Sequence, residues 1–162
     1  MSNEHTVKSY EEELRYLIDS VIKMGSLTES QLVDSMDAII KVDKDSIDKI
    51  IKSDDEINKF RSKIDTQIMT LLVKRAPMAI DLRETISSLK ISQDLERIGD
   101  LSKSNAKKVK PLPLDLPEEL LGNLKRLGEL VIKQLNDVLD SYVNKNYRSE
   151  EHTSELQSPC NL

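Results

Sequence analysis

The chain has 162 residues, of which 33% are charged and only 3% aromatic, and it contains no tryptophan. This length suits one domain of ordinary size, and the shortage of aromatic residues favours an all-α fold over a sheet. The formal net charge of −5 argues against a nucleic-acid partner. No apolar run approaches the roughly 20 residues that span a bilayer and the polar amino terminus lacks a signal-peptide pattern, so we expect a cytoplasmic protein without direct membrane insertion.

The first predicted helix covers about residues 7–42, where apolar side chains recur at intervals of three, four and seven residues. Gly25 lies on this apolar stripe, so we expect it to permit the close approach of another helix. The second predicted helix covers about residues 45–74 and carries an isoleucine-rich face. A polar stripe is expected beside that face, formed by Asp54, Asn58, Arg61 and Asp65.

Prolines divide the rest of the chain. Pro77 is expected to end the second helix, because proline disfavours the helical conformation in the residue before it. The third helix is expected to start near Met78 and to end before Pro111, in a proline-rich loop at residues 111–116. Pro117 is expected to open a fourth helix, as proline is favoured in a first helical turn.

The fourth helix repeats part of the first. At an offset of 103 residues, six positions are identical: Gly25, Leu27, Gln31, Leu32, Asp34 and Asp37 match Gly128, Leu130, Gln134, Leu135, Asp137 and Asp140. This predicts an internal repeat whose unit is a group of three helices. We therefore expect a three-helix bundle at residues 7–110 and the first helix of a second, truncated bundle at residues 117–147.

The segment at residues 148–162 breaks the apolar period and resembles the in-frame translation of a common sequencing-adapter read. We treat it as a non-native tail and exclude it from functional inference. Cys160 and His152 lie in this tail, which leaves His5 as the one histidine and no cysteine. Cys/His zinc sites, Cys or His nucleophiles and Glu-x-x-His di-iron sites are then excluded, and carboxylates and amides remain as metal ligands.

One carboxylate pair is spaced to share a cation. Glu96 and Asp100 are four residues apart on the third predicted helix, which places them on one face, away from Ile91, Leu95 and Ile98. Asp54 and Asn58 have the same spacing on the second helix, and Asp54 and Asp100 lie equally far in sequence from Pro77. The two pairs should therefore meet across a helical hairpin and form a metal site. The alternative is a solvated acidic face with weak surface ion pairs, for example between Glu96 and Lys103 or Arg97.

Three segments carry a family resemblance: residues 77–83 (PMAIDLR), 89–91 (LKI) and above all 94–100 (DLERIGD). They resemble the most recognisable block of the PhoU family of phosphate-transport regulators, and the resemblance extends from Ser9 to about Asn146. It implies two tandem three-helix bundles and surface clusters of iron or zinc on Glu/Asp-x-x-x-Asp motifs. Glu96 and Asp100 match this motif, whereas Asn58 replaces its second carboxylate beside Asp54, and Ser104 stands at a position that is often asparagine.

The resemblance also implies the function. It indicates a non-enzymatic, cytoplasmic negative regulator of phosphate uptake and phosphate-starvation signalling. Such an adaptor would contact the ATPase subunit of a phosphate ABC transporter and a phosphate-sensing histidine kinase, and would form a homodimer. The alternatives are a PhoU-like regulatory domain of a larger phosphate transporter or another fusion protein, and a coiled-coil protein without a site. A di-iron enzyme is disfavoured, because it needs Glu-x-x-His pairs and the chain has none.

Overall fold

The computed structural model of the chain describes the backbone of residues 2–75, 79–113 and 115–156, and the side chains of residues 10–74, 82–113 and 115–144. Within these ranges it contains helices and no strand. The helices are α1 (Ser2–Lys41), α2 (Ile47–Arg75), α3 (Ala79–Lys108) and α4 (Glu118–Leu156). The all-α prediction is confirmed. Pro77 and the expected start of the third helix at Met78 lie outside the described residues.

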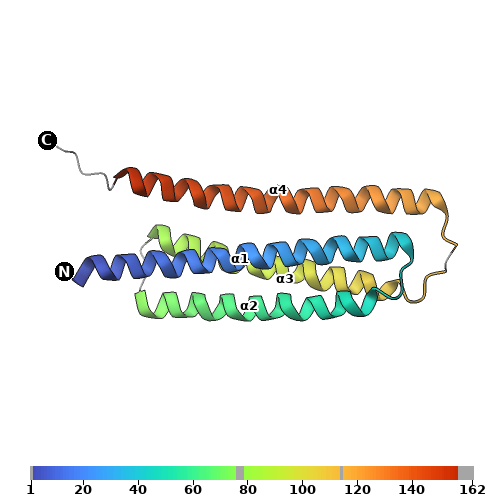
Figure 1. Ribbon diagram of the computed structural model, residues 1–162, viewed down its shortest axis with the longest axis horizontal. Helices are drawn as coiled ribbons and strands as arrows, with labels where there is room; N and C mark the ends of the chain where they lie inside the picture. The colour runs from blue at the N-terminus through green and yellow to red at the C-terminus, as the bar shows by residue number, and fades with distance from the viewer. Residues whose placement is uncertain (1, 76–78, 114, 157–162) are drawn as a thin grey trace.

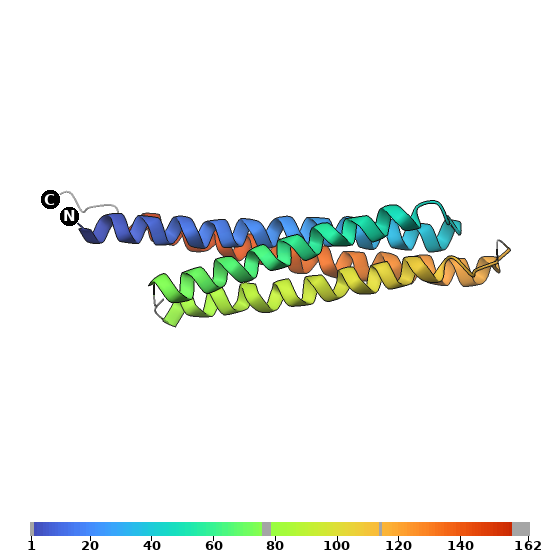
Figure 2. The same ribbon diagram turned by 90° about the horizontal axis from the view of Figure 1, so that it is seen from below.

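The first three helices form an antiparallel bundle, and α4 lies beside it. Figure 1 shows α1 and α3 between α2 on one side and α4 on the other, and Figure 2 shows α2 running at an angle to α1. The helix α1 packs against all three others, whereas α4 packs mainly against α1. One hydrogen bond also joins α4 to α3, between the Tyr142 and Ser88 hydroxyls at 3.0 Å. On one side of α1, the helices α2 and α3 complete a three-helix bundle. On its other side, α1 packs against the single helix α4.

The core follows the predicted apolar stripes of α1 and α2. On α2 the expected isoleucine-rich face is buried, and it packs against the α1 side chains of Leu17, Val21 and Met24, which have no exposed surface. A spacing of three and four residues places these side chains on one side of each helix. Burial of this apolar surface is the main stabilising contribution to the bundle.

The buried face of α3 is built from different residues than the buried faces of α1 and α2. Leu82 is exposed, and the stripe that faces the bundle consists mainly of small residues: Thr85, Ser88, Ser92, Leu95, Gly99, Ser102 and Ala106. Three of its serine hydroxyls donate hydrogen bonds to backbone carbonyls three or four residues earlier in α3. Because these hydroxyls are satisfied within their own helix, small polar residues can occupy a buried face and let α3 approach α1 closely.

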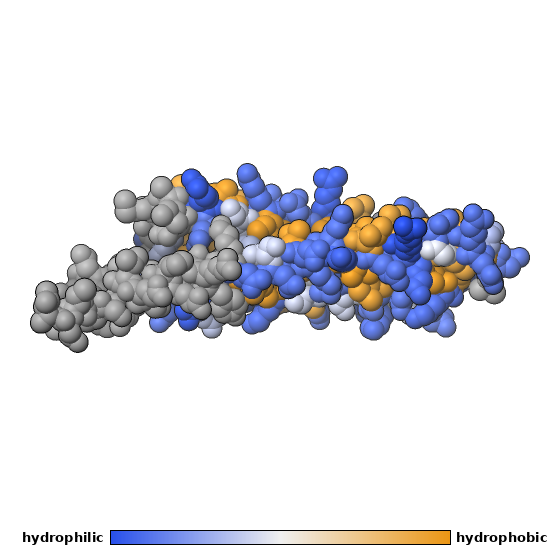
Figure 3. Space-filling model, turned by 90° about the horizontal axis from the view of Figure 1, so that it is seen from above, coloured by the Kyte–Doolittle hydropathy of each residue, from blue (hydrophilic) through white to orange (hydrophobic). Residues whose placement is uncertain are grey.

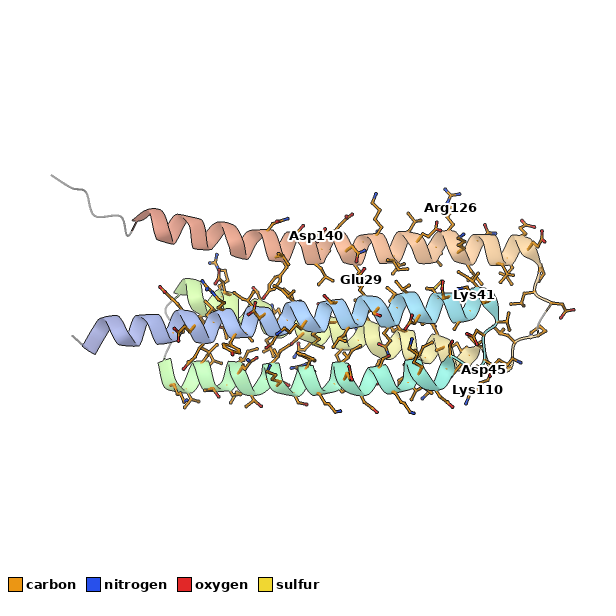
Figure 4. All side chains as sticks on the ribbon, viewed as in Figure 1. Glu29, Lys41, Asp45, Lys110, Arg126 and Asp140 are labelled. Atoms are coloured by element: carbon orange, nitrogen blue, oxygen red, sulfur yellow. The ribbon has the colours of Figure 1, made fainter. Side chains whose placement is uncertain are left out.

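A second, smaller cluster of buried hydrophobic side chains closes the end of the bundle at the α1–α2 turn. Figure 4 marks this end with Lys41, Asp45 and Lys110. Val42 has a positive φ of 49°, which ends α1. The Asp43 carboxylate then accepts hydrogen bonds from the Ser46 hydroxyl and from the backbone N–H groups of residues 45 and 46, where the next helix begins. These bonds, above all the one from the Ser46 hydroxyl, lower the pKa of Asp43.

The helix α4 is longer than the sequence pattern indicated. Its backbone remains helical to Leu156, beyond residue 147, where the apolar period was expected to end. Arg, Ser and Glu at residues 148–151 tolerate a helix, so an established helix can continue through them. Residues 157–162, including Cys160, lie outside the described backbone, and the non-native origin of the tail stays a prediction.

Candidate functional site

Asp54 is a buried carboxylate in the middle of the bundle. It lies between Ile50 and Ile57 on α2, and only 1% of the residue is exposed. The expectation that Asp54 belongs to a polar stripe beside the core is therefore wrong. The spacing explains the difference, because positions 50, 54 and 57 lie on the same side of a helix as the apolar stripe. A carboxylate at such a position requires partners for both oxygens.

Two amides and one ammonium group supply these partners. The Gln31 Nε2 of α1 donates to Asp54 Oδ1 at 3.4 Å and to the Ile50 carbonyl at 3.2 Å. The Asn58 Nδ2, one turn further along α2, donates to Asp54 Oδ2 at 3.2 Å. Lys103 Nζ of α3 lies 2.5 Å from the same oxygen. Residues from all three helices of the bundle thus converge on one carboxylate.

Lys103 links the two predicted halves of the site. Its Nζ also lies 3.6 Å from Asp100 Oδ1, one turn earlier on α3. The hydrogen bond to Asp54 is the main cause that raises the pKa of Lys103 above its ordinary value, and the nearby Asp100 adds to it. The expected meeting of the Asp54 and Asp100 levels across the hairpin is confirmed, with an ammonium group between the two carboxylates.

Glu96 and Asp100 lie on the outer side of α3. Asp100 is exposed and Glu96 half-buried, whereas Leu95 is buried in the core. Their face is therefore the one the spacing predicted. Gly99, between them, is buried, and a Cβ there would lie 3.0 Å from Gln31 Oε1 and 3.1 Å from Ile57 Cδ1. Glycine at this position lets α3 approach the residues of α1 and α2 that surround Asp54.

The four predicted ligands do not form one metal site in this arrangement. Among the described residues, no three His, Cys, Asp or Glu side chains are grouped as a metal ion requires. Both Asp54 oxygens accept hydrogen bonds, and the nearest amide groups point their N–H donors, not their oxygens, towards them. These residues therefore do not fit an iron or zinc ion that includes Asp54. A metal held by Glu96 and Asp100 alone stays a prediction.

Sequence reasoning missed Gln31 and the role of Lys103. Gln31 was identified only as one of six residues shared by the repeat, and its buried position next to Asp54 depends on how α1 and α2 pack. Lys103 was considered as a partner of Glu96, although it lies three residues after Asp100 and can reach that carboxylate on the helix surface. The signal for Lys103 was this i, i+3 spacing.

The contact between α1 and α4 is reciprocal. A Cβ at Gly25 would lie 2.6 Å from Leu139 Cδ2, and a Cβ at Gly128 would lie 2.6 Å from Met36 Cε. Gly25 and Gly128 correspond under the offset of 103 residues, and so do Met36 and Leu139. Each contact is thus the repeat-related copy of the other, as in an interface around a two-fold axis. The predicted role of Gly25 in close helix approach is confirmed.

One face of α4 is open. We call the residues Leu120, Leu127, Val131, Gln134 and Val138 the open face, because all five are exposed. Figure 3 shows hydrophobic side chains reaching the surface in patches on the side of the molecule where α4 lies. Within the described part of the chain, no helix has the length and apolar composition to cross a membrane. The open face is an exposed, mostly apolar face of α4, and the opposite side of the helix packs against α1.

A groove of about 400 Å³ lies between α1 and α4. Glu29 of α1 and Asp140 of α4 are among the residues that line it, and Figure 4 labels both at the boundary of the two helices. Ser26 and Asn136 add polar groups, and Ile22 and Leu139 add apolar ones. Among the described residues, no three His, Cys, Asp or Glu side chains are grouped to hold a metal ion, so the two carboxylates of the groove are not assigned one.

Comparisons with known proteins agree with the resemblance seen in the sequence. The family model for the PhoU domain matches residues 21–109. A "phosphate-specific transport system accessory protein PhoU homolog" of Caulobacter vibrioides is 40% identical over 140 residues, which cover 86% of this chain and 61% of that protein. A relative with the same name from Rhizobium meliloti is 37% identical over 146 residues, covering 90% of this chain and 62% of the relative.

The similarity extends to more distant relatives and covers part of their length. The Edwardsiella tarda accessory protein PhoU is 32% identical over 140 residues, which cover 86% of this chain and 58% of that protein. The chain thus spans about three fifths of the length of the curated relatives it matches. No solved structure gives a significant match.

Proposed function

The chain belongs to the PhoU family, and we propose that it is a cytoplasmic negative regulator of phosphate uptake and phosphate-starvation signalling. One observation carries this proposal. Identity of 40% extends over 140 residues to a protein named as an accessory of a phosphate-specific transport system. These residues cover 86% of this chain, so the likeness is not confined to one motif.

The proposed mode of action is binding rather than catalysis. The chain presents long helices with charged surfaces, and one of them has an open apolar face. Surfaces of this kind dock against other proteins, and helices commonly bind partners through such faces. The proposed partners are the ATPase subunit of the phosphate ABC transporter and the phosphate-sensing histidine kinase, with the regulator acting as an adaptor that keeps the kinase inactive when phosphate is plentiful. The proposed assembly is a homodimer.

Disruption of the parent gene tests the regulatory role. Phosphate-starvation genes should then be expressed in medium rich in phosphate, and a plasmid copy of the intact gene should silence them again. Unchanged expression in the disrupted strain would contradict the proposal. Co-purification with the ATPase subunit and with the cytoplasmic part of the kinase measures each partner separately, and sedimentation at several concentrations measures the dimer.

A further inference from the structure

The cluster around Asp54 contains its own cation. Asp54 is 1% exposed, and an ionised carboxylate at this depth needs a counter-charge and hydrogen bonds to remain in the fold. Lys103 Nζ supplies both at 2.5 Å, and its side chain is 25% exposed, so its aliphatic stem packs in the bundle while its ammonium group points to the carboxylate. The positive charge is thus part of the chain itself.

The amide groups are oriented for a carboxylate that is paired with an ammonium. Gln31 Nε2 faces the Ile50 carbonyl as well as Asp54. Because a carbonyl oxygen only accepts hydrogen bonds, this contact fixes which end of the Gln31 amide faces the cluster. The Asn58 Nδ2 also donates to Asp54. A metal ion at this position would require oxygen lone pairs where the structure has N–H donors.

The second carboxylate is within reach of the same charge. Lys103 Nζ lies 3.6 Å from Asp100 Oδ1. A metal ion between Glu96 and Asp100 would lie close to this ammonium group and would be repelled by it. Lys103 therefore disfavours a metal ion at both predicted pairs. It occupies the position beside Asp54 and Asn58, and its positive charge repels a cation between Glu96 and Asp100.

From this geometry we propose that the Lys103 ammonium takes the place of a metal ion between α2 and α3. The site is closed to iron and zinc as long as this charge is present. Loss of the charge leaves Asp54, Asp100 and the outward Glu96 with an excess of negative charge at one level of the hairpin, which a divalent cation can then neutralise. The proposal concerns the cluster alone and does not depend on the regulatory role.

Zinc titration of the purified chain after chelator treatment tests the proposal. The variant Lys103→Met removes the charge and keeps the apolar stem, whereas Lys103→Arg keeps the charge. Lys107→Met is the matched control, because Lys107 is an exposed lysine one turn further along α3. Zinc binding by histidine or cysteine elsewhere in the chain is common to all variants and cancels in the comparison.

Lys103→Met should bind Zn²⁺ at least about tenfold more tightly than the wild-type chain, because a repelling charge a few Å away is gone. Lys103→Arg and Lys107→Met should bind as the wild type does, and adding Asp54→Asn to Lys103→Met should remove the gain. Equal Zn²⁺ affinity of Lys103→Met and wild type would overturn the proposal.

A second measurement needs no change at Lys103 and decides the question if Lys103→Met fails to fold. The wild-type chain and Asp54→Asn are each equilibrated with Zn²⁺ or Fe²⁺, desalted and analysed for bound metal. Equal metal content supports the proposal. One ion per chain that is retained by the wild type and lost in Asp54→Asn would show that a metal binds beside Lys103, and the proposal would be wrong.

Discussion

The inner face of α1 and the open face of α4 carry corresponding residues in opposite environments. The inner face consists of Leu17, Met24, Thr28, Gln31 and Ser35, each at most 1% exposed. At the offset of 103 residues these positions become the open face, where Leu120, Leu127, Val131 and Val138 are 41–61% exposed. The two helices share one spacing and differ in their neighbours, since α2 and α3 cover the inner face of α1 but not the open face of α4. An amphipathic pattern thus shows that a helix has a face to bury, but not which partner covers it.

The largest effect is expected when a large side chain is truncated on each of the two faces. Met24→Ala should lower the free energy of unfolding by about 2–5 kcal/mol, because it leaves a cavity in a packed core. Leu127→Ala, at the corresponding position of α4, should change it by no more than about 0.5 kcal/mol, since the side chain is exposed. Urea denaturation followed by circular dichroism measures both. Similar losses for the two variants would mean that the open face is covered in solution.

The glutamines of the repeat give a matched polar pair. Gln31→Ala should cost about 1–3 kcal/mol, because the buried Asp54 carboxylate and the Ile50 carbonyl each lose a hydrogen-bond donor. Gln134→Ala should be neutral or slightly stabilising, since Gln134 is exposed and alanine favours a helix. The urea midpoints of the two variants provide the measurement. An equal cost at Gln134 would show that the open face makes a similar buried contact.

The free energy of unfolding should also depend on pH in the alkaline range, because Lys103 forms its ion pair inside the bundle. Because its pKa is raised in the folded chain, the stabilisation from the ion pair is fully present below the ordinary lysine pKa of about 10.4 and is lost as pH rises through the higher, folded value. The wild type should therefore exceed Lys103→Met by a constant margin of about 1.5–3 kcal/mol at neutral pH, which shrinks at higher pH. Urea midpoints measured from pH 7 upwards give this margin.

The pH series contains its own control. All other titratable groups are common to the wild type and the variant, so the difference between the two reports on Lys103. Lys107→Met should show no change in its margin with pH. A wild-type margin over Lys103→Met that stays constant through the alkaline range would contradict the ion pair as the source of the stabilisation.

The sequence predicted the helices well because their apolar residues recur with helical spacing and prolines or a turn separate them. It also placed Asp54 and Asp100 at one level of the hairpin. Burial of Asp54 was not predicted, because the same spacing fits a polar stripe as well as a core position until the packing of α1 is known. The small-residue face of α3 was missed for a related reason: Ser88 and Ser102 look polar in sequence, and they are buried because their hydroxyls bond within their own helix.

Two glycines of α4 provide the finest test of the comparison. Nothing lies within 4 Å of the position that a Cβ would take at Gly122, whereas a Cβ at Gly128 would lie 2.6 Å from Met36 Cε. Gly122→Ala should therefore stabilise the chain by roughly 0.5–1 kcal/mol, because alanine restricts the unfolded chain and favours the helix. At Gly128 the same gain is opposed by the displacement of Met36, so the net change should be close to zero or destabilising.

Thermal unfolding of the two single variants and of Gly25→Ala separates helix propensity from helix contact. Gly25 and Gly128 make repeat-related contacts, so their alanine variants should behave alike and differ from Gly122→Ala in the same direction. If Gly128→Ala raised the melting temperature as much as Gly122→Ala, then α4 would not be held against α1 in solution. The open face of α4 and the side that packs against α1 would then both be exposed to solvent. The whole of α4, and not its open face alone, would differ from the buried inner face of α1.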